Sequence, residues 1–164
     1  MTDTPTGPNG GGEQSEAAEQ QGPRLAILTQ YIKDLSFENP RAPSGLQPSQ
    51  PRPEIQIQVD VNAQTLAEGQ YEVVLQLKVE ANAGGSPVFL IELTYGGLFG
   101  LANIPEDSLQ PLLLIECPRL LFPFARRVVA DCTRDGGFPP LMIDPIDFVT
   151  LFRRRMQQED TAQA

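Results

Sequence analysis

The 164 residues include 21 acidic and 12 basic side chains, no histidine, and 40% hydrophobic residues, enough for one domain with a core. The net charge of −9 repels nucleic-acid phosphates and anionic membranes, so we expect basic or apolar partners. Without histidine, Ser-His-Asp and Cys-His catalysis and histidine-ligated zinc are excluded. Enzyme chemistry would have to use carboxylates alone, and we expect no catalytic residue, metal or cofactor.

The two cysteines point to a reducing compartment. Cys117 and Cys132 belong to no CxxC motif. If one helix carries both, they lie ~22 Å apart and cannot pair within the chain. No hydrophobic signal segment follows Met1, and no apolar run reaches about 18 residues. These features predict a cytoplasmic protein.

The chain begins with a polar tail and a short strand. Residues 1–22 contain almost no apolar side chain and are expected to be disordered. In "YIKDLSFENP", residues 31–40, apolar and polar side chains alternate from Ile32 to Glu38, as in a half-buried strand. Asp34 and Glu38 share one face of it. They meet either water or a partner, and the strand alone does not decide between these alternatives.

A sheet is predicted from the next three segments. Residues 39–53 contain five prolines in fifteen positions and form a long connection that is either functional or loose. Alternation over 54–61, 70–81 and 88–95 predicts three more strands, and the short links between them predict antiparallel hairpins. The glycines of "YGGLFG" lack the spacing of a phosphate loop, which favours a bulge or a strand exit.

Residues 106–137 predict a long helix that covers the apolar face of this sheet. Pro118 and Pro123 should kink or interrupt it. Its apolar side chains from Leu112 to Phe124 run nearly all the way round, so a second surface needs burial, most simply against another subunit. The interface is therefore placed at four residues of this helix: Leu113, Cys117, Leu121 and Phe122.

A second, shorter helix is predicted over residues 145–156. In "DPID", Asp144 fits an N-cap, Pro145 the first helical position and Asp147 the first turn. Asp131 and Asp135 fall in the last turn of the long helix. Capping explains these carboxylates better than catalysis does. The fold class is α+β, a four-stranded antiparallel sheet with a long connection after the first strand, covered on one face by a long kinked helix and a short C-terminal helix.

The polar positions of the strands predict an acidic outer face. Solvation alone would not favour one sign of charge so strongly, and apolar residues within the acidic rim suit a basic partner. The predicted acids are Asp34, Glu38, Glu54, Asp60, Glu72, Glu80 and Glu92, with Lys78 as the single base and Ile32, Val74 and Leu90 as exposed apolar residues.

Five sequence blocks in order resemble the SecB family of bacterial export chaperones over residues 25–156. They read "IKDLSFENP", "YEVVL", "FLIELTYGGLF", "CPRLLFPFARRVV" and "GGFPPLMIDPIDFVTLF". The resemblance implies an ATP-independent chaperone, assembled as a dimer of dimers, that holds preproteins unfolded and passes them to the motor SecA. It implies a chaperone domain at 23–156 and a flexible tail at 157–164. The chain departs from the family in lacking a tryptophan in the long connection and in having a short C-terminal tail.

The resemblance also implies two binding surfaces. The SecA surface maps to Asp34, Glu38, Leu90 and Glu92. An unfolded client needs a long, adaptable apolar site, which the resemblance places at Leu46, Ile55, Ile57, Phe138, Leu141 and Phe152, although each of these also fits an ordinary core or subunit contact.

Two other functions remain open from the sequence. One is an acidic oligomeric scaffold that binds a single folded partner without holding unfolded chains. The weaker one is a carboxylate enzyme with a small-molecule pocket.

Overall fold

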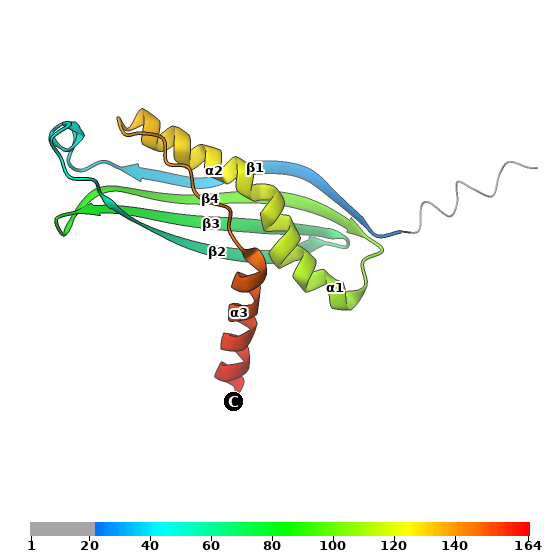
Figure 1. Cartoon of the computed structure of the whole chain (residues 1–164). Helices are drawn as coiled ribbons and strands as arrows, with labels where there is room; N and C mark the ends of the chain where they lie inside the picture. The colour runs from blue at the N-terminus through cyan, green and yellow to red at the C-terminus, as the bar shows by residue number, and fades with distance from the viewer. Residues whose placement is uncertain (1–21) are drawn as a thin grey trace, which may run out of the picture.

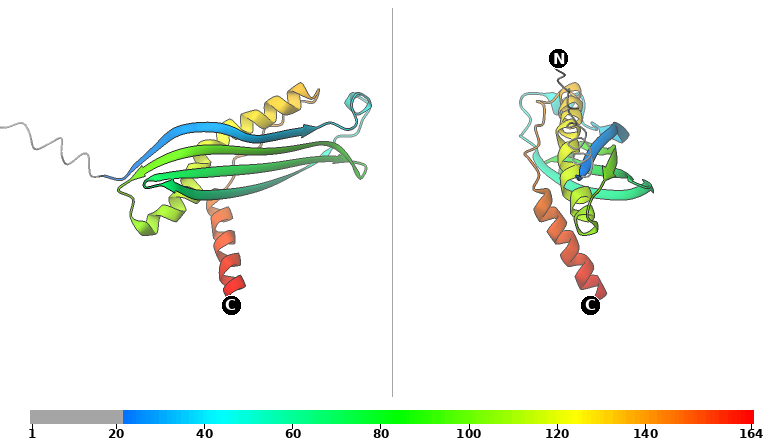
Figure 2. Two further views of the ribbon diagram at one scale, coloured as in Figure 1. Left: turned by 180° about the vertical axis from the view of Figure 1, so that it is seen from behind. Right: turned by 90° about the vertical axis from the view of Figure 1, so that its right-hand side faces the viewer.

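The computed structural model describes residues 22–164. Within that range four strands form one antiparallel sheet in the order β1-β4-β3-β2, with the helices against one face (Figures 1 and 2). This confirms the predicted α+β class. The strands are β1 (Arg24–Glu38), β2 (Glu54–Ala67), β3 (Gln70–Ala83) and β4 (Ser86–Ala102).

Every strand extends beyond the range predicted from alternation. The greatest difference is in β4, where the glycine run is part of the strand rather than its exit. The side chain of Tyr31 fills the space where a Cβ on Gly96 would stand, and Leu121 and Phe99 fill that of Gly97. These glycines are therefore explained by close packing on both faces of the sheet.

The inner face carries the core. Along β3, Val73, Leu75, Leu77 and Val79 are all at most 1% exposed, and Ile91 and Leu93 on β4 are opposite Val79 and Leu77. Because side chains alternate between the faces of a sheet, the intervening polar residues point away from the helices. The alternation that predicted these strands therefore separates an apolar inner face from a polar outer face.

The covering helix runs from Glu106 to Asp135 as α1 (Glu106–Pro111), η3 (Leu112–Glu116) and α2 (Cys117–Asp135). The two internal prolines do not interrupt it. Pro118 has no N–H to donate to the carbonyl of Leu114, and the π-helical turn η3 lies at this point and contains Leu114. Pro123 lies inside α2.

The C-terminal helix differs most from its prediction. α3 (Phe148–Gln163) begins three residues later than expected, and Asp147 is its N-cap, since the Asp147 carboxylate accepts from the Thr150 amide at 3.0 Å. The predicted cap at Asp144 is therefore wrong. The helix also continues through residues 157–163, where a flexible tail was predicted, and projects past the edge strand β2 (Figure 1).

The long connection, residues 39–53, contacts the rest of the fold at several points. It contains one 3-10 turn, η2 (Ser44–Leu46). Asn39 donates to the carbonyl of Gly136 at 2.9 Å, and Arg41 donates to the carbonyl of Ala83 at 3.1 Å. Leu46 packs against Gly137, which follows α2. The connection is thus attached to the C-terminal end of α2 and to the β3–β4 hairpin. The expected disordered tail, residues 1–22, lies outside the described residues except for Gly22.

Candidate binding surfaces

The outer face of the sheet is acidic, as the alternation predicted. Three cross-strand rows lie side by side on it: Asp34–Thr94–Gln76–Asp60, Ser36–Glu92–Lys78–Gln58 and Glu38–Leu90–Glu80–Gln56. We call the acids Asp34, Glu38, Asp60, Glu80 and Glu92 in these rows, together with Leu90, the acidic face.

This face brings all four residues of the predicted SecA surface together. Asp34 and Glu92 line one hollow of about 510 Å³, together with Asp60 and Lys78. Leu90 is partly buried and lies directly between Glu38 and Glu80. An apolar side chain flanked by two carboxylates can contact an apolar group of a partner whose basic groups meet the acids.

Two predicted members of the outer face differ from expectation. A β-bulge at Lys33 shifts the alternation of β1, so Ile32 pairs with Tyr95 on the helix side of the sheet. Glu72 does face outward, but it is 6% exposed and bonded to Lys33, so its charge is not available to a partner. Tyr31 and Lys33, which the alternation did not place on this face, bond to Glu72 there. A bulge leaves no clear mark on a sequence, which explains why Ile32 was placed on the wrong face and why the contacts of Glu72 with Tyr31 and Lys33 were not foreseen.

The predicted client residues fall into two groups on the inner side. Phe138 packs on Phe89 with ring centroids 5.0 Å apart, and Phe89 lies in one cross-strand row with Ala81 and Ile55. Ile55 and Ile57 are each 38% exposed although they point to the helix side. Helix α2 therefore leaves this part of the edge strand β2 uncovered.

Phe152 belongs to the second group. It lines a cavity of about 600 Å³ between α3 and β2, together with Val59, Leu114 and Leu151. Val59 continues the inner stripe of β2 that begins with Ile55 and Ile57. The two groups are thus joined by one apolar stripe along β2. We call Ile55, Ile57, Val59, Phe138 and Phe152 the apolar stripe.

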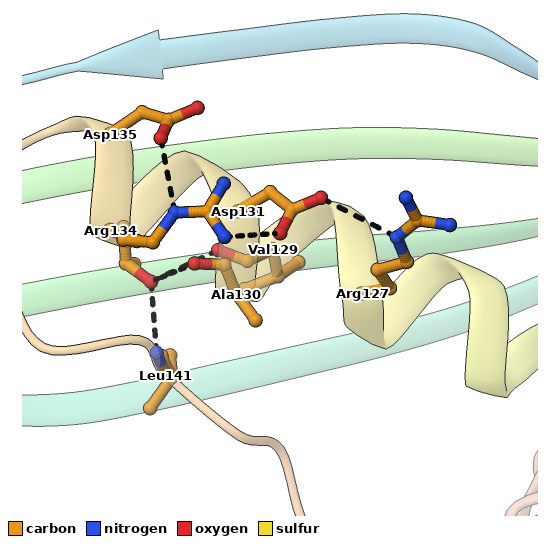
Figure 3. A network of polar contacts seen from close by, with 8 residues as sticks. Arg127, Val129, Ala130, Asp131, Arg134, Asp135 and Leu141 are labelled. Atoms are coloured by element: carbon orange, nitrogen blue, oxygen red, sulfur yellow. Dashed lines mark hydrogen bonds and ion pairs between the residues drawn. The ribbon is translucent and has the colours of Figure 1, made fainter.

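Thr133 positions Leu141, another of the predicted client residues. It is fully buried on α2, and its hydroxyl accepts a hydrogen bond from the Leu141 amide at 2.8 Å (Figure 3). The same hydroxyl lies 3.0 Å from the carbonyl of Ala130, to which it can donate. Leu141 is half-buried in the connector between α2 and α3. The hydroxyl therefore fixes the path of a connector that no regular ladder holds.

The four residues assigned to the subunit interface are inside the subunit. Leu113, Cys117, Leu121 and Phe122 are at most 8% exposed, because this side of the helix packs on the sheet and on α3. The exposed large apolar residues of the same helix are Leu120 and Phe124, at 40% and 48%. The four predicted interface residues therefore offer little surface to another subunit, which the sequence could not show because an all-round apolar helix does not reveal which side meets its own sheet.

The remaining carboxylates of α2 form ion pairs along its surface. Asp131 lies 3.6 Å from Arg127 and 3.3 Å from Arg134, and Arg134 also pairs with Asp135 at 3.2 Å (Figure 3). Within residues 22–164 no cluster of three or more cysteine, aspartate or glutamate side chains is arranged to hold a metal ion. In the same range, none of the helices has both the length and the apolarity needed to cross a bilayer.

The fold and these two surfaces define an α+β binding protein whose sheet is acidic on one face and carries exposed apolar residues on the other. Comparison with known proteins gives the family. Residues 18–159 match the family described as "Preprotein translocase subunit SecB". The Protein-export protein SecB of a Bradyrhizobium species is 54% identical over 155 residues, covering 94% of both chains. That of Azorhizobium caulinodans is 56% identical over 141 residues, covering 86% of this chain and 88% of the relative.

A solved structure supports the fold. The SecB-like chaperone of Mycobacterium tuberculosis, in complex with a ChAD peptide from the HigA1 antitoxin, matches with a TM-score of 0.63 at 17% identity. The match covers 75% of this chain and 91% of that chain. The chain belongs to the SecB family and is a protein-export chaperone. SecB is a family of chaperones rather than of enzymes.

Proposed function

We propose that the chain holds unfolded preproteins on its apolar stripe, without nucleotide, and delivers them to SecA through its acidic face, in the cytoplasm. The observation that supports this proposal is that the two surfaces lie on opposite faces of one sheet. A client bound on the helix side of the sheet therefore leaves the acidic face free to contact SecA. An acidic face that carries Leu90 between Glu38 and Glu80 suits a basic docking partner, and the net charge of −9 supports the same choice.

The client surface suits an extended chain. An unfolded client offers apolar side chains in no fixed order, so its site should be long and apolar rather than a closed pocket. The apolar stripe runs along an edge strand, and Leu46, at 36% exposure, extends the exposed apolar surface beside Gly137. The ChAD peptide bound by the Mycobacterium tuberculosis relative is in keeping with peptide capture by this fold.

A homotetramer, arranged as a dimer of dimers, is part of this proposal. Leu120 and Phe124 on α2 are exposed, as are Ile32 and Leu35 on the helix side of the edge strand β1, at 49% and 38%. Their burial between subunits would remove apolar area from water at about 25 cal/mol per Å². The tetramer is tested by native mass spectrometry with and without an unfolded preprotein.

The docking half is tested by charge reversal. Asp34→Lys and Glu92→Lys should weaken SecA binding, most strongly at low salt, because exposed charges contribute little to folding and much to association. Leu90→Ala should weaken binding with less salt dependence. Glu106→Lys, at the start of α1 and outside the acidic face, is the matched control. Titration against SecA at two salt concentrations gives the answer, and wild-type affinity of both reversals at low salt would exclude this docking surface.

The holding half is tested at Ile57. Ile57→Asn should reduce suppression of aggregation of an unfolded preprotein without nucleotide, while thermal unfolding and SecA binding remain near wild type. Gln58→Asn, the next residue on the opposite face, is its control. Equal client affinity of a folded Ile57→Asn variant would remove this residue from the client surface. Failure of the wild type to suppress aggregation would favour the scaffold function.

A further inference from the structure

Strand β1 has two breaks in register, at Leu28 and at Lys33, and the bulge at Lys33 decides which residues reach the acidic face. Tyr31 and Phe37 are six positions apart, so a regular strand would place them on the same face. In the structure Tyr31 lies over Gly96 on the outer face, whereas Phe37 packs on Phe89 on the inner face, with ring centroids 6.2 Å apart. One extra residue, Lys33, lies between the pairs Ile32–Tyr95 and Asp34–Thr94. Because of this extra residue, Tyr31 can lie on the outer face while Phe37 lies on the inner face.

A buried carboxylate lies beside this bulge. Glu72 on β3 is 6% exposed. The Lys33 ammonium donates to its two oxygens at 2.8 and 3.1 Å, and the Gln64 amide on β2 donates at 2.6 Å. The Tyr31 hydroxyl donates to Oε1 of the same carboxylate. Glu72 on β3 therefore bonds to Gln64 on the neighbouring strand β2 and, across β4, to Tyr31 and the bulged residue Lys33 on β1.

The carboxylate of Glu72 is charged, and both of its oxygens accept hydrogen bonds from the side chains around it. Hydrogen bonds from Lys33 and Tyr31 lower the pKa of Glu72 below its ordinary value. Burial and the bond to Glu72 raise the pKa of Tyr31 to about 12. At neutral pH a carboxylate thus accepts from a protonated phenol and an ammonium. A Cβ at Gly96 would lie 2.6 Å from Cε2 of Tyr31, so the glycine permits the tyrosine to cross β4 and reach Glu72.

We infer that Glu72 is a positioning residue for the acidic face: by holding Tyr31 and Lys33 it fixes the bulge, and the bulge points Asp34 and Glu38 outward. Without the extra residue, Asp34 would face Leu93 and the helix side, because a shift of one residue reverses the faces of a strand. The inference rests on the proposed docking of SecA and adds a specificity-determining residue that does not touch the partner.

The test combines SecA affinity with a measurement on the strand itself. Glu72→Leu keeps a similar side-chain volume at a buried site but removes the acceptor, and Lys33→Met, at a half-exposed side chain, removes the ammonium with less risk to folding. Glu116→Gln is the matched control, since it also removes an ion pair, to Arg119 at 2.7 Å, but lies outside the acidic face and away from the bulge. We expect faster amide hydrogen exchange at residues 33–36 in the first two variants and not in the control.

SecA affinity should fall roughly tenfold in Glu72→Leu. It should fall much less when the change is made in an Asp34→Asn background, because Glu72 acts through Asp34, whereas a general loss of stability would give additive effects. If Glu72→Leu and Lys33→Met bind SecA normally while Asp34→Lys does not, the inference is wrong and the docking surface stands. If Asp34→Lys also binds normally, the docking surface itself is wrong. Unchanged exchange at residues 33–36 overturns the role of Glu72 in the bulge whatever the affinities.

Discussion

Thr133→Val should release the connector that carries Leu141. Valine has nearly the shape of threonine, so the change removes one hydroxyl and leaves the packing of a fully buried site almost intact. The Leu141 amide then loses its acceptor at 2.8 Å. The carbonyls of Val129 and Ala130 lose the hydroxyl as a donor but remain part of the backbone of helix α2. Leaving a buried amide without a partner costs ~1–3 kcal/mol, and because Leu141 is half-buried we expect a value near the lower end of this range.

The measurements are urea unfolding at fixed chain concentration and amide exchange at Leu141. We expect a lower free energy of unfolding by ~1–3 kcal/mol and faster exchange at this amide, together with weaker client capture if Leu141 contributes to the client surface. Thr133→Ser is the control, because it keeps the acceptor and loses one methyl group. Normal exchange at the Leu141 amide in Thr133→Val would refute the reasoning, since the bond would then be dispensable.

The remaining predictions concern assembly, pH and thiol reactivity. Leu120→Glu, at 40% exposure, should yield a folded chain that sediments as a smaller species, whereas Leu121→Glu, at 0%, should fail to fold because an unpaired buried charge costs several kcal/mol. The lowered pKa of Glu72 stabilises the fold above the ordinary glutamate pKa, and this contribution is lost as pH falls through the lowered value. The free energy of unfolding of the wild type should therefore exceed that of Lys33→Met at neutral pH, and urea unfolding at several pH values should show the difference shrinking in acid. Burial raises the pKa of Cys117 to about 12, so a thiol reagent at pH 8 should label it only after unfolding, which mass spectrometry measures.

Much of the fold and one of the two surfaces followed from local patterns. Alternation has a period of two, and from the sequence by itself it correctly placed Asp34, Glu38, Leu90 and Glu92 on one face of the sheet. The absence of histidine excluded catalysis that needs an imidazole, and the excess of acidic residues predicted basic or apolar partners. The five sequence blocks indicated the family that the comparisons then showed.

Tertiary contacts decided the rest. The bulge at Lys33 depends on Glu72, which is 39 residues away in sequence, so no window of the sequence around Ile32 could show that this residue turns to the helix side. From Leu112 to Phe124 the apolar side chains run nearly all the way round the helix, and only the positions of the sheet and α3 determine that Leu121 is buried while Leu120 is exposed. A pattern fixes which residues share a face when the backbone is regular, but long-range packing determines where regularity breaks and which face is covered.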